Sequence, residues 1–367
     1  MNGKNAQLAP HVLHVLPNAT SVELIRQFGS RLRHTLVTAD GALPDGLTKS
    51  PWLKPASDFP ALDGLPTPGR MQRLARALTP FDLVLTHGWG ALDVAMAHTL
   101  FKDAMDLPAL VHHEDAPDEP YGVRRKWYRR LALGKSAGLV VPGELLEARA
   151  LVDWQQPMGR VKKIPHGIET KAFARPPKPD SFRLIKHGGE KWIGAWSGSG
   201  EKADLLPLVS ALPELDETWQ LIVLGERPQA PALDRLIDDN SLNARVYFTG
   251  PVADTARVMG LFDIVVAASD GDGFPQHTVE AMAAARAVIA RSASESTQVL
   301  DPQSVGFVFD PAIPSMLPAM LRKLAEDSSL RAELGEANRL RAVQLYDRAK
   351  THATYQRLYA SAMKREF

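Results

Sequence analysis

Short apolar runs alternate with amphipathic helical patterns along the chain, and this alternation occurs in two successive sets. The pattern is typical of parallel strands joined by right-handed crossovers, with helices on both faces of each sheet. The runs of the first set lie at 11–16, 34–39, 82–87, 109–114, 138–142 and 161–165, and those of the second at 192–197, 219–225, 246–250, 263–269, 287–292 and 306–310. We therefore predict an α/β fold with two doubly wound, Rossmann-like domains.

The stretch FARPPKPDSF separates the two sets. Its prolines and its lack of periodicity indicate a connection between domains. We predict a first domain over residues 1–172, a linker over 173–181 and a second domain over 182–349, with a helical region over 316–364. Because ligands of open α/β sheets bind beyond the carboxyl ends of the strands, we expect the site residues in the loops that follow the strands.

The composition limits the class of protein. The chain has 367 residues, of which 45% are hydrophobic and 23% are charged, and it has no cysteine. This is the balance of a globular protein without disulfides or thiolate metal sites. The first residues do not resemble a signal peptide, and no apolar run approaches the roughly 18 residues of a membrane-spanning helix, so we expect a cytoplasmic location. A net charge of +1 does not indicate a nucleic-acid partner.

The stretch DGDGFPQHTVEAMA, residues 270–283, joins a turn to a strong helix former. Pro275 suits the first turn of a helix, where its missing N–H group costs nothing. The amides of Gln276, His277 and Thr278 would then point toward the strand ends and, with the helix dipole, form an anion site.

Two carboxylates flank this anion site. Asp272 precedes the turn and Glu280 lies in the first turns of the helix, so each could accept hydrogen bonds from the hydroxyls of a ligand whose phosphate lies between them. This arrangement suits a sugar nucleotide. The alternative is that Glu280 only complements the helix dipole and that Asp272 only shapes the turn.

Several stretches, in order along the chain, resemble family-four glycosyltransferases of the group 1 type. DGFPQHTVEAMAAARAVIA is similar to the family's signature of Glu-Gly-Phe-Pro followed by Glu-Ala-Met-Ala, and VKKIPHGIETKAF is similar to its segment at the domain junction. The resemblance covers most of residues 109–362. It implies a GT-B fold with two domains facing a central cleft and a C-terminal helix, residues 350–367, that crosses back to the first domain. It also implies retaining, metal-independent transfer of a sugar from a UDP- or GDP-linked donor, without a further cofactor.

The resemblance also assigns roles to the residues of the motif. Glu280 would bind the ribose hydroxyls, and Asp272 would bind hydroxyls of the transferred sugar. Because the family has the longer Glu at the position of Asp272, a shifted or different donor sugar is implied. The residues expected to contact the sugar and the diphosphate are Gly273, Phe274, Pro275, Gln276, His277 and Thr278.

A second glycine-rich stretch, WIGAWSGSGEKADLL, follows the first apolar run of the second set. By the resemblance, Lys202 would neutralise the diphosphate leaving group, and Ser197 stands where the family has an arginine. Two cations normally stabilise the charge that develops on such a leaving group. Without the arginine, Ser197 and the Gly198 amide would act as neutral donors, or Lys191 or another cation would replace the arginine. A partial match to a dinucleotide fingerprint is a weak indication of NAD, because only Glu226 is available as the acidic residue it requires.

The most polar strand end of the first set is ALVHHED, which contains His112, His113, Glu114 and Asp115. Strand alternation puts His113 and Asp115 on one side and the other two residues on the opposite side, and the sequence does not select between them. His87 ends the preceding run and is a further candidate for the acceptor side. The alternative for each is a hydrogen bond that stabilises a turn. No third ligand at metal spacing is evident, so we expect no metal.

A basic and aromatic cluster follows this strand end. Its residues are Arg124, Arg125, Lys126, Trp127, Tyr128, Arg129 and Arg130. The cluster could contact anionic lipid headgroups at the inner face of a membrane or the pyrophosphate of an acceptor. The alternative is a solvated helix whose Trp127 packs inward.

The sequence therefore predicts a retaining glycosyltransferase of the hexosyltransferase type that builds bacterial cell-surface polysaccharide or glycoconjugates. The first domain would bind a glycan or lipid-linked acceptor, and the residues expected to take part in catalysis are Lys202, Asp272, His113 and Asp115. Two alternatives stay open. One is a nucleotide-sugar 2-epimerase of similar fold, and the other is a glycosyltransferase-like binding or assembly protein without activity, which the serine at position 197 favours.

Overall fold

The computed structural model describes residues 9–16, 22–39, 50–115, 122–178, 184–197, 204–268 and 273–367. The chain divides into a first unit of Met1–Pro165 with His352–Phe367 and a second unit of His166–Thr351. Residues 166–172 thus belong to the second unit, whereas the sequence prediction placed them in the first. They do so because Ile168 pairs with Asp347 and Thr170 donates a hydrogen bond of 2.6 Å to the Asp347 carboxylate.

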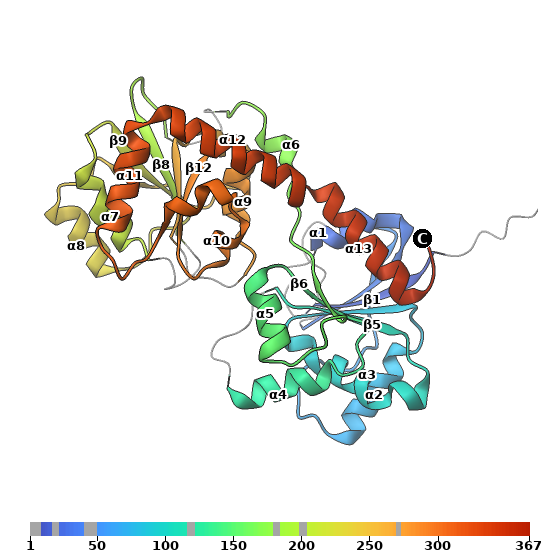
Figure 1. Ribbon diagram of the computed structural model, residues 1–367. Helices are drawn as coiled ribbons and strands as arrows, with labels where there is room; N and C mark the ends of the chain where they lie inside the picture. Colours follow the sequence, from blue (N-terminus) through green and yellow to red (C-terminus); the bar gives the residue numbers. More distant parts are fainter. Residues whose placement is uncertain are drawn as a thin grey trace, which may run out of the picture. The chain divides into compact units, whose positions relative to one another are not determined.

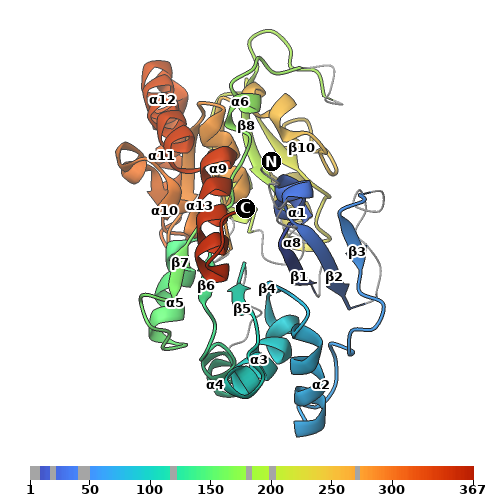
Figure 2. The same ribbon diagram turned by 90° about the vertical axis from the view of Figure 1, so that its right-hand side faces the viewer.

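The first unit contains a seven-stranded parallel sheet of order β3-β2-β1-β4-β5-β6-β7. The strands are β1 (His11–Leu16), β2 (Arg33–Thr38), β3 (Leu53–Pro55), β4 (Leu83–His87), β5 (Ala109–His113), β6 (Gly138–Val141) and β7 (Val161–Lys163). The sequence prediction omitted β3, which lies at the edge of the sheet beside β2 (Figure 2). With three residues that end in a proline, β3 has neither the length nor the alternation of a recognisable strand.

Helices cover both faces of the first sheet. They are α1 (Val22–Phe28), α2 (Pro68–Leu78), α3 (Leu92–Met105), α4 (Val123–Ala132), α5 (Glu144–Val152) and α13 (Arg348–Met363), with 3-10 turns at Gly29–Arg31 and Trp89–Ala91. Figure 1 shows α1 and α13 over one face and α2, α3 and α4 over the other. Tyr355 and Tyr359 of α13 pack with Val12 and Leu85 on the first face, so the C-terminal helix is part of the first unit from His352 onward.

The second unit contains a six-stranded parallel sheet of order β10-β9-β8-β11-β12-β13. Its strands are β8 (Lys191–Trp196), β9 (Trp219–Leu224), β10 (Val246–Phe248), β11 (Ile264–Ala267), β12 (Ala287–Arg291) and β13 (Val308–Phe309). Its helices are α6 (Thr170–Phe173), α7 (Leu206–Ala211), α8 (Pro231–Asp239), α9 (Gln276–Ala283), α10 (Glu295–Val299), α11 (Met316–Glu326) and α12 (Ser328–Leu345), and its 3-10 turns are Leu212–Glu214, Thr255–Arg257, Met259–Leu261 and Pro302–Phe307.

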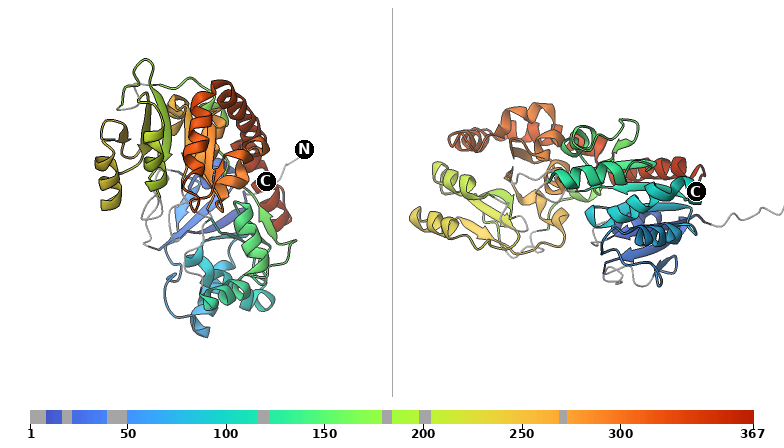
Figure 3. Two further views of the ribbon diagram at one scale, coloured as in Figure 1. Left: turned by 60° about the vertical axis from the view of Figure 1, so that its left-hand side comes forward. Right: turned by 90° about the horizontal axis from the view of Figure 1, so that it is seen from below.

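Two apolar layers enclose the second sheet, and its helices lie on both sides of the strands (Figure 3, left). Leu208 of α7 and Leu321 of α11 pack against one face, and Met282 of α9 and Ala342 of α12 pack against the other. The prediction of two doubly wound, Rossmann-like domains is therefore confirmed. Among the described residues, no helix has both the length and the apolar character needed to cross a membrane.

Candidate functional site

The second sheet reverses its chain order between β8 and β11, which are neighbours. A crevice at such a reversal, beyond the carboxyl ends of the strands, is where open α/β sheets bind ligands. Because the described strands of this sheet are paired in parallel, the residues that follow β8, β9, β11 and β12 lie at one edge. The predicted donor residues with described positions all belong to these loops or to α9.

The amino-terminal end of α9 lies at this edge. Pro275 is its N-cap and supplies no side-chain hydrogen bond. The amide of Gln276 donates to the carbonyl of Phe274 at 2.9 Å, so this amide is not free as the sequence prediction had it. The amides of His277 and Thr278 have no backbone acceptor among the described residues. Two free amides therefore remain for an anion, with the helix dipole behind them.

Glu280 is almost fully buried, with 4% of its surface exposed. Gln276 donates to its Oε1 at 2.9 Å, and the Nδ1 of His277 lies 3.1 Å from its Oε2. A buried carboxylate needs such partners, and these two fix its orientation. Since a carboxylate offers about four lone-pair sites, Glu280 can still accept hydrogen bonds from two ligand hydroxyls.

An aromatic stack joins α9 to the end of β8. The rings of Trp196 and His277 are parallel within 4°, with centroids 4.8 Å apart. The indole nitrogen of Trp196 is buried and has no acceptor in the described part of the chain. The Thr278 hydroxyl lies 3.0 Å from that of Ser296 in α10, and this contact holds α9 against α10. Phe274 packs between His166 and Tyr346 at the start of the motif.

Ser197 follows β8 and is bound to β9. Its amide donates to the carbonyl of Leu224 at 3.0 Å, and its hydroxyl lies 3.4 Å from the same oxygen. Gly225 adopts a φ of +113°, and a Cβ at this position would lie 2.3 Å from the Ser197 hydroxyl oxygen. Ser197 therefore fits closely against a backbone that only glycine adopts readily. Gly198, Lys202 and Asp272 lie outside the described residues.

Arg291 provides a cation at the site edge. The sequence predicted Lys191 as a possible replacement for the family's arginine. Lys191 begins β8 at the opposite edge of the sheet, and six residues of extended chain, or roughly 20 Å, separate it from Ser197. Its amine lies 3.8 Å from Asp263. Arg291 instead ends β12, is 19% exposed and lies 3.8 Å from Asp204. The polar stretch ARSASES that follows this apolar strand was the signal that could have identified it.

In the first unit, His112 and Glu114 face α4. The Nε of Arg129 donates to the Glu114 carboxylate at 3.0 Å, and both side chains are at most 1% exposed. The guanidinium of Arg129 lies 4.8 Å from the ring centre of Trp89 and 5.0 Å from that of Trp154. The His112 Nδ1 lies 2.9 Å from the hydroxyl of Thr86. Glu114 thus compensates a buried cation.

His113 lies on the opposite face, as strand alternation predicts. Its Nε2 forms a hydrogen bond of 2.8 Å with the hydroxyl of Tyr359, and its ring stacks on that of His87 at 4.4 Å. Burial raises the pKa of the Tyr359 hydroxyl, and the nearby Tyr355 and Asp115 raise this pKa further. Tyr359 therefore stays protonated. Of the five acceptor-side candidates, only Asp115 is partly exposed.

Comparison with known proteins agrees with this geometry. Residues 192–327 match the family model described as glycosyl transferases group 1. The MMP alpha-(1->4)-mannosyltransferase of Mycolicibacterium hassiacum is 25% identical over 331 residues, which cover 81% of this chain and 77% of that protein. A crystal structure of a glycosyltransferase from Rickettsia africae has a TM-score of 0.79 at 15% identity, covering 98% of this chain and all (100%) of that one. The Anabaena HepE structure in complex with UDP has a TM-score of 0.78 at 16% identity, covering 96% of this chain and 100% of that one.

The second unit carries a group 1 glycosyltransferase domain. The GT-B fold and the group 1 resemblance are thereby confirmed, and the matched range contains β8 from Trp192 onward, the loop after β12 and the whole of α9. The site edge described above therefore lies inside the matched region. Among the described residues, no group of three or more histidine and acidic side chains could hold a metal ion.

Helix α4 of the first unit exposes an apolar row. Val123, Trp127 and Leu131, spaced four residues apart, are 71%, 54% and 57% exposed. The interpretation in which Trp127 packs inward is therefore wrong. The guanidinium of Arg130 lies 4.9 Å from the Trp127 ring centre, on the exposed side of the helix. Arg129 points the other way, into the core.

Proposed function

We propose that the protein is a retaining glycosyltransferase that moves a sugar from a UDP- or GDP-linked donor to an acceptor hydroxyl, in the synthesis of bacterial cell-surface polysaccharide or glycoconjugates. The observation that carries this proposal is Glu280, a buried carboxylate oriented by Gln276 and His277 beside two free amides of α9. Hydroxyl-accepting and phosphate-binding groups are thus adjacent, as a nucleotide sugar requires.

In this proposal the second unit binds the donor. Glu280 accepts hydrogen bonds from the ribose, and the amides of His277 and Thr278 bind the diphosphate. By resemblance, Asp272 binds the transferred sugar, and Lys202 neutralises the leaving group. Arg291 supplies the second cation in place of the family's arginine, because it lies at the same edge of the sheet and retains some exposure.

The first unit binds the acceptor, with Asp115 as its most exposed candidate. His113 positions this end of β5 through Tyr359 rather than exchanging a proton, since its ring is buried against two aromatic neighbours. A retaining transfer needs no protein nucleophile when the acceptor attacks from the leaving-group face and a donor phosphate oxygen takes its proton. We expect neither a metal nor a further cofactor.

We also propose that α4 contacts the anionic inner face of a membrane. Its exposed apolar row would insert at the interface while Lys126 and Arg130 meet lipid phosphates. Vesicles with 30% phosphatidylglycerol should bind the protein at low salt, and Trp127→Ser should weaken this binding about tenfold. Leu100→Ser removes an equally exposed apolar side chain from α3 and serves as the control. Equal binding to neutral vesicles would rule out this contact.

A screen of UDP-, GDP- and ADP-sugars tests the function. Binding together with slow donor hydrolysis, in which the released sugar keeps its anomeric configuration at first formation, supports a retaining transferase. Conversion of the donor sugar to an epimer would identify a 2-epimerase instead. If no nucleotide sugar binds, the role of a binding or assembly protein without activity takes the place of the proposed function.

A further inference from the structure

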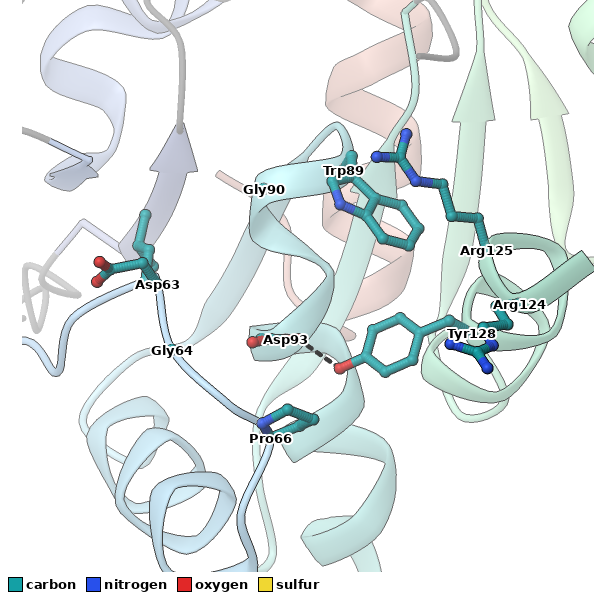
Figure 4. A pocket seen from close by; sticks show the side chains of 10 residues that line it. Asp63, Gly64, Pro66, Trp89, Gly90, Asp93, Arg124, Arg125 and Tyr128 are labelled. Carbon is teal, nitrogen blue, oxygen red and sulfur yellow. Dashed lines mark hydrogen bonds between the residues drawn. The ribbon is translucent and has the colours of Figure 1, made fainter. Parts of the chain in front are cut away.

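A pocket of about 430 Å³ lies in the first unit, at the carboxyl ends of β4 and β5 (Figure 4). Its volume is in the range of small-molecule sites. Its lining residues are Leu62, Asp63, Gly64, Pro66, Trp89, Gly90, Asp93, Arg124, Arg125 and Tyr128. The pocket therefore combines two aromatic rings, two guanidinium groups and two carboxylates within one unit.

The wall formed by residues 61–66 is held from behind by Arg70. This buried side chain, 7% exposed, donates to the carbonyls of Ala61 and Leu62 and pairs with Asp93. Gly64 has a φ of +120° and lies against the Arg70 side chain. The wall is thus held in place by hydrogen bonds from a buried side chain.

The pocket's two carboxylates differ in their hydrogen-bond partners and in their exposure. Asp93 accepts a hydrogen bond from Tyr128 and pairs with Arg70, as the dashed line in Figure 4 shows for Tyr128. Burial, followed by the hydrogen bond to Asp93, raises the pKa of Tyr128, so its hydroxyl remains a donor. Asp63 lies on the opposite wall and is exposed, and Figure 4 shows its carboxylate turned away from Trp89 and Tyr128.

Two arginines, Arg124 and Arg125, bring positive charge to the pocket. Arg125 lies 4.8 Å from the ring centre of Trp89, and among the described residues neither Arg124 nor Arg125 is within ion-pair distance of a carboxylate. The first turn of α4 has no acidic residue and begins at Gly122, which provides no side-chain cap. Cations at this end of a helix oppose its dipole, so a bound anion would relieve the repulsion.

We infer that this pocket binds an acceptor sugar that carries an anionic group, such as a sugar phosphate or a sugar linked through a diphosphate. The inference rests on the proposed function and names its acceptor class. The anionic group lies against the guanidinium of Arg125 beside Trp89, whose planar donors match its oxygens, and Arg124, which lies beside Tyr128 in Figure 4, adds positive charge to the pocket. The sugar lies against the rings of Trp89 and Tyr128.

The test uses the full chain, labelled with ¹⁵N and observed at the Trp89 indole N–H, which a Trp89→Phe variant assigns. Glucose, galactose, mannose and N-acetylglucosamine 1-phosphates are titrated, with their methyl glycosides as neutral controls. We expect at least one phosphate to bind ten or more times as tightly as its methyl glycoside. Arg125→Gln should weaken this binding about tenfold, and Arg130→Gln, whose guanidinium lies over Trp127 outside the pocket, should leave it unchanged.

Raising the salt concentration from 50 to 500 mM should weaken binding to the wild-type chain, which tests the charge independently of any variant. A polyprenyl-diphosphate sugar in micelles, compared with the free phosphate, distinguishes a lipid-linked from a soluble acceptor. The inference is overturned if no phosphate exceeds its methyl glycoside, or if Arg124→Gln/Arg125→Gln binds as the wild type does. UDP binding measured on the same samples reports on the donor site alone, so its loss would count against the proposed function and not against this pocket.

Discussion

Replacing Glu114 by glutamine should destabilise the first unit strongly. The change keeps the shape of the side chain but removes the carboxylate that faces Arg129 at 3.0 Å, in a place where both groups are at most 1% exposed. Arg129 is held between Trp89 and Trp154, so its guanidinium cannot turn toward water without disrupting the core. Breaking one partner of a buried ion pair costs about 3–5 kcal/mol, because the other charge stays buried and uncompensated.

Urea unfolding, monitored by hydrogen exchange in peptides from β4 and β5, measures the free energy of unfolding of the first unit separately from that of the second. The matched control is Glu144→Gln, which removes one of the two carboxylates paired with Lys163; this pair has an N–O distance of 2.9 Å, and its side chains are 38% (Lys163) and 53% (Glu144) exposed. We expect the control to cost less than about 1 kcal/mol.

A second variant tests the cause. Glu114→Gln combined with Arg129→Met removes both charges, and such replacements by apolar residues of similar volume are often neutral or stabilising. The double variant should therefore be more stable than Glu114→Gln alone. The compensating role of Glu114 is refuted if Glu114→Gln lowers the free energy of unfolding by less than about 1 kcal/mol, or if the double variant is no more stable than Glu114→Gln alone. Either result would mean that Glu114 does not compensate the charge of Arg129, and would support its assignment from the sequence to the acceptor site.

Two further predictions concern stability. Buried histidines of the first unit with lowered pKa values are His14, His34, His87 and His98, of which burial lowers the pKa of His34 and His98 to about 4. Because the unfolded chain takes up protons below the usual pKa of about 6.5 and these folded histidines do not, the unfolding free energy should fall as the pH is lowered from 6.5 toward 4. A flat urea midpoint across this range would contradict their burial as neutral rings. Gly225→Ala should destabilise the second unit by at least about 1 kcal/mol, since its φ of +113° and the hydroxyl of Ser197 leave no space for a methyl group; a thermal midpoint equal to that of the wild type would contradict this fit.

The fold could be predicted from the sequence because its main signal is local. Each of the twelve predicted apolar runs overlaps a strand, and the alternation with helices fixes parallel pairing. The edge strand β3 could not be predicted, because three residues with a proline carry no periodicity. The domain boundary was displaced because the backbone pairing of Ile168 with Asp347, far apart in sequence, assigns residues 166–172 to the second unit.

The candidate site was predictable only where one motif contains it. Glu280 and its partners Gln276 and His277 are four and three residues apart on one helix, so helical geometry brings them together. Trp196 and Arg291 come from other strands, and only the sheet order places them beside α9. The same limit applies to His112 and Glu114, since alternation separates the faces of β5 but does not say that Arg129 occupies one of them.

The affinity of UDP and GDP for Glu280→Gln and Glu280→Ala, measured by isothermal titration calorimetry, tests the central claim most directly. The wild-type chain should bind one of these nucleotides, and each variant should bind it at least about 100-fold more weakly, because two charge-assisted hydrogen bonds to the ribose are worth about 1.5–3 kcal/mol each. Glu336→Gln, which removes an exposed carboxylate bonded to Arg339 on α12, should bind as the wild type does. An unchanged nucleotide affinity in Glu280→Ala would contradict the assignment of this helix end as the donor site.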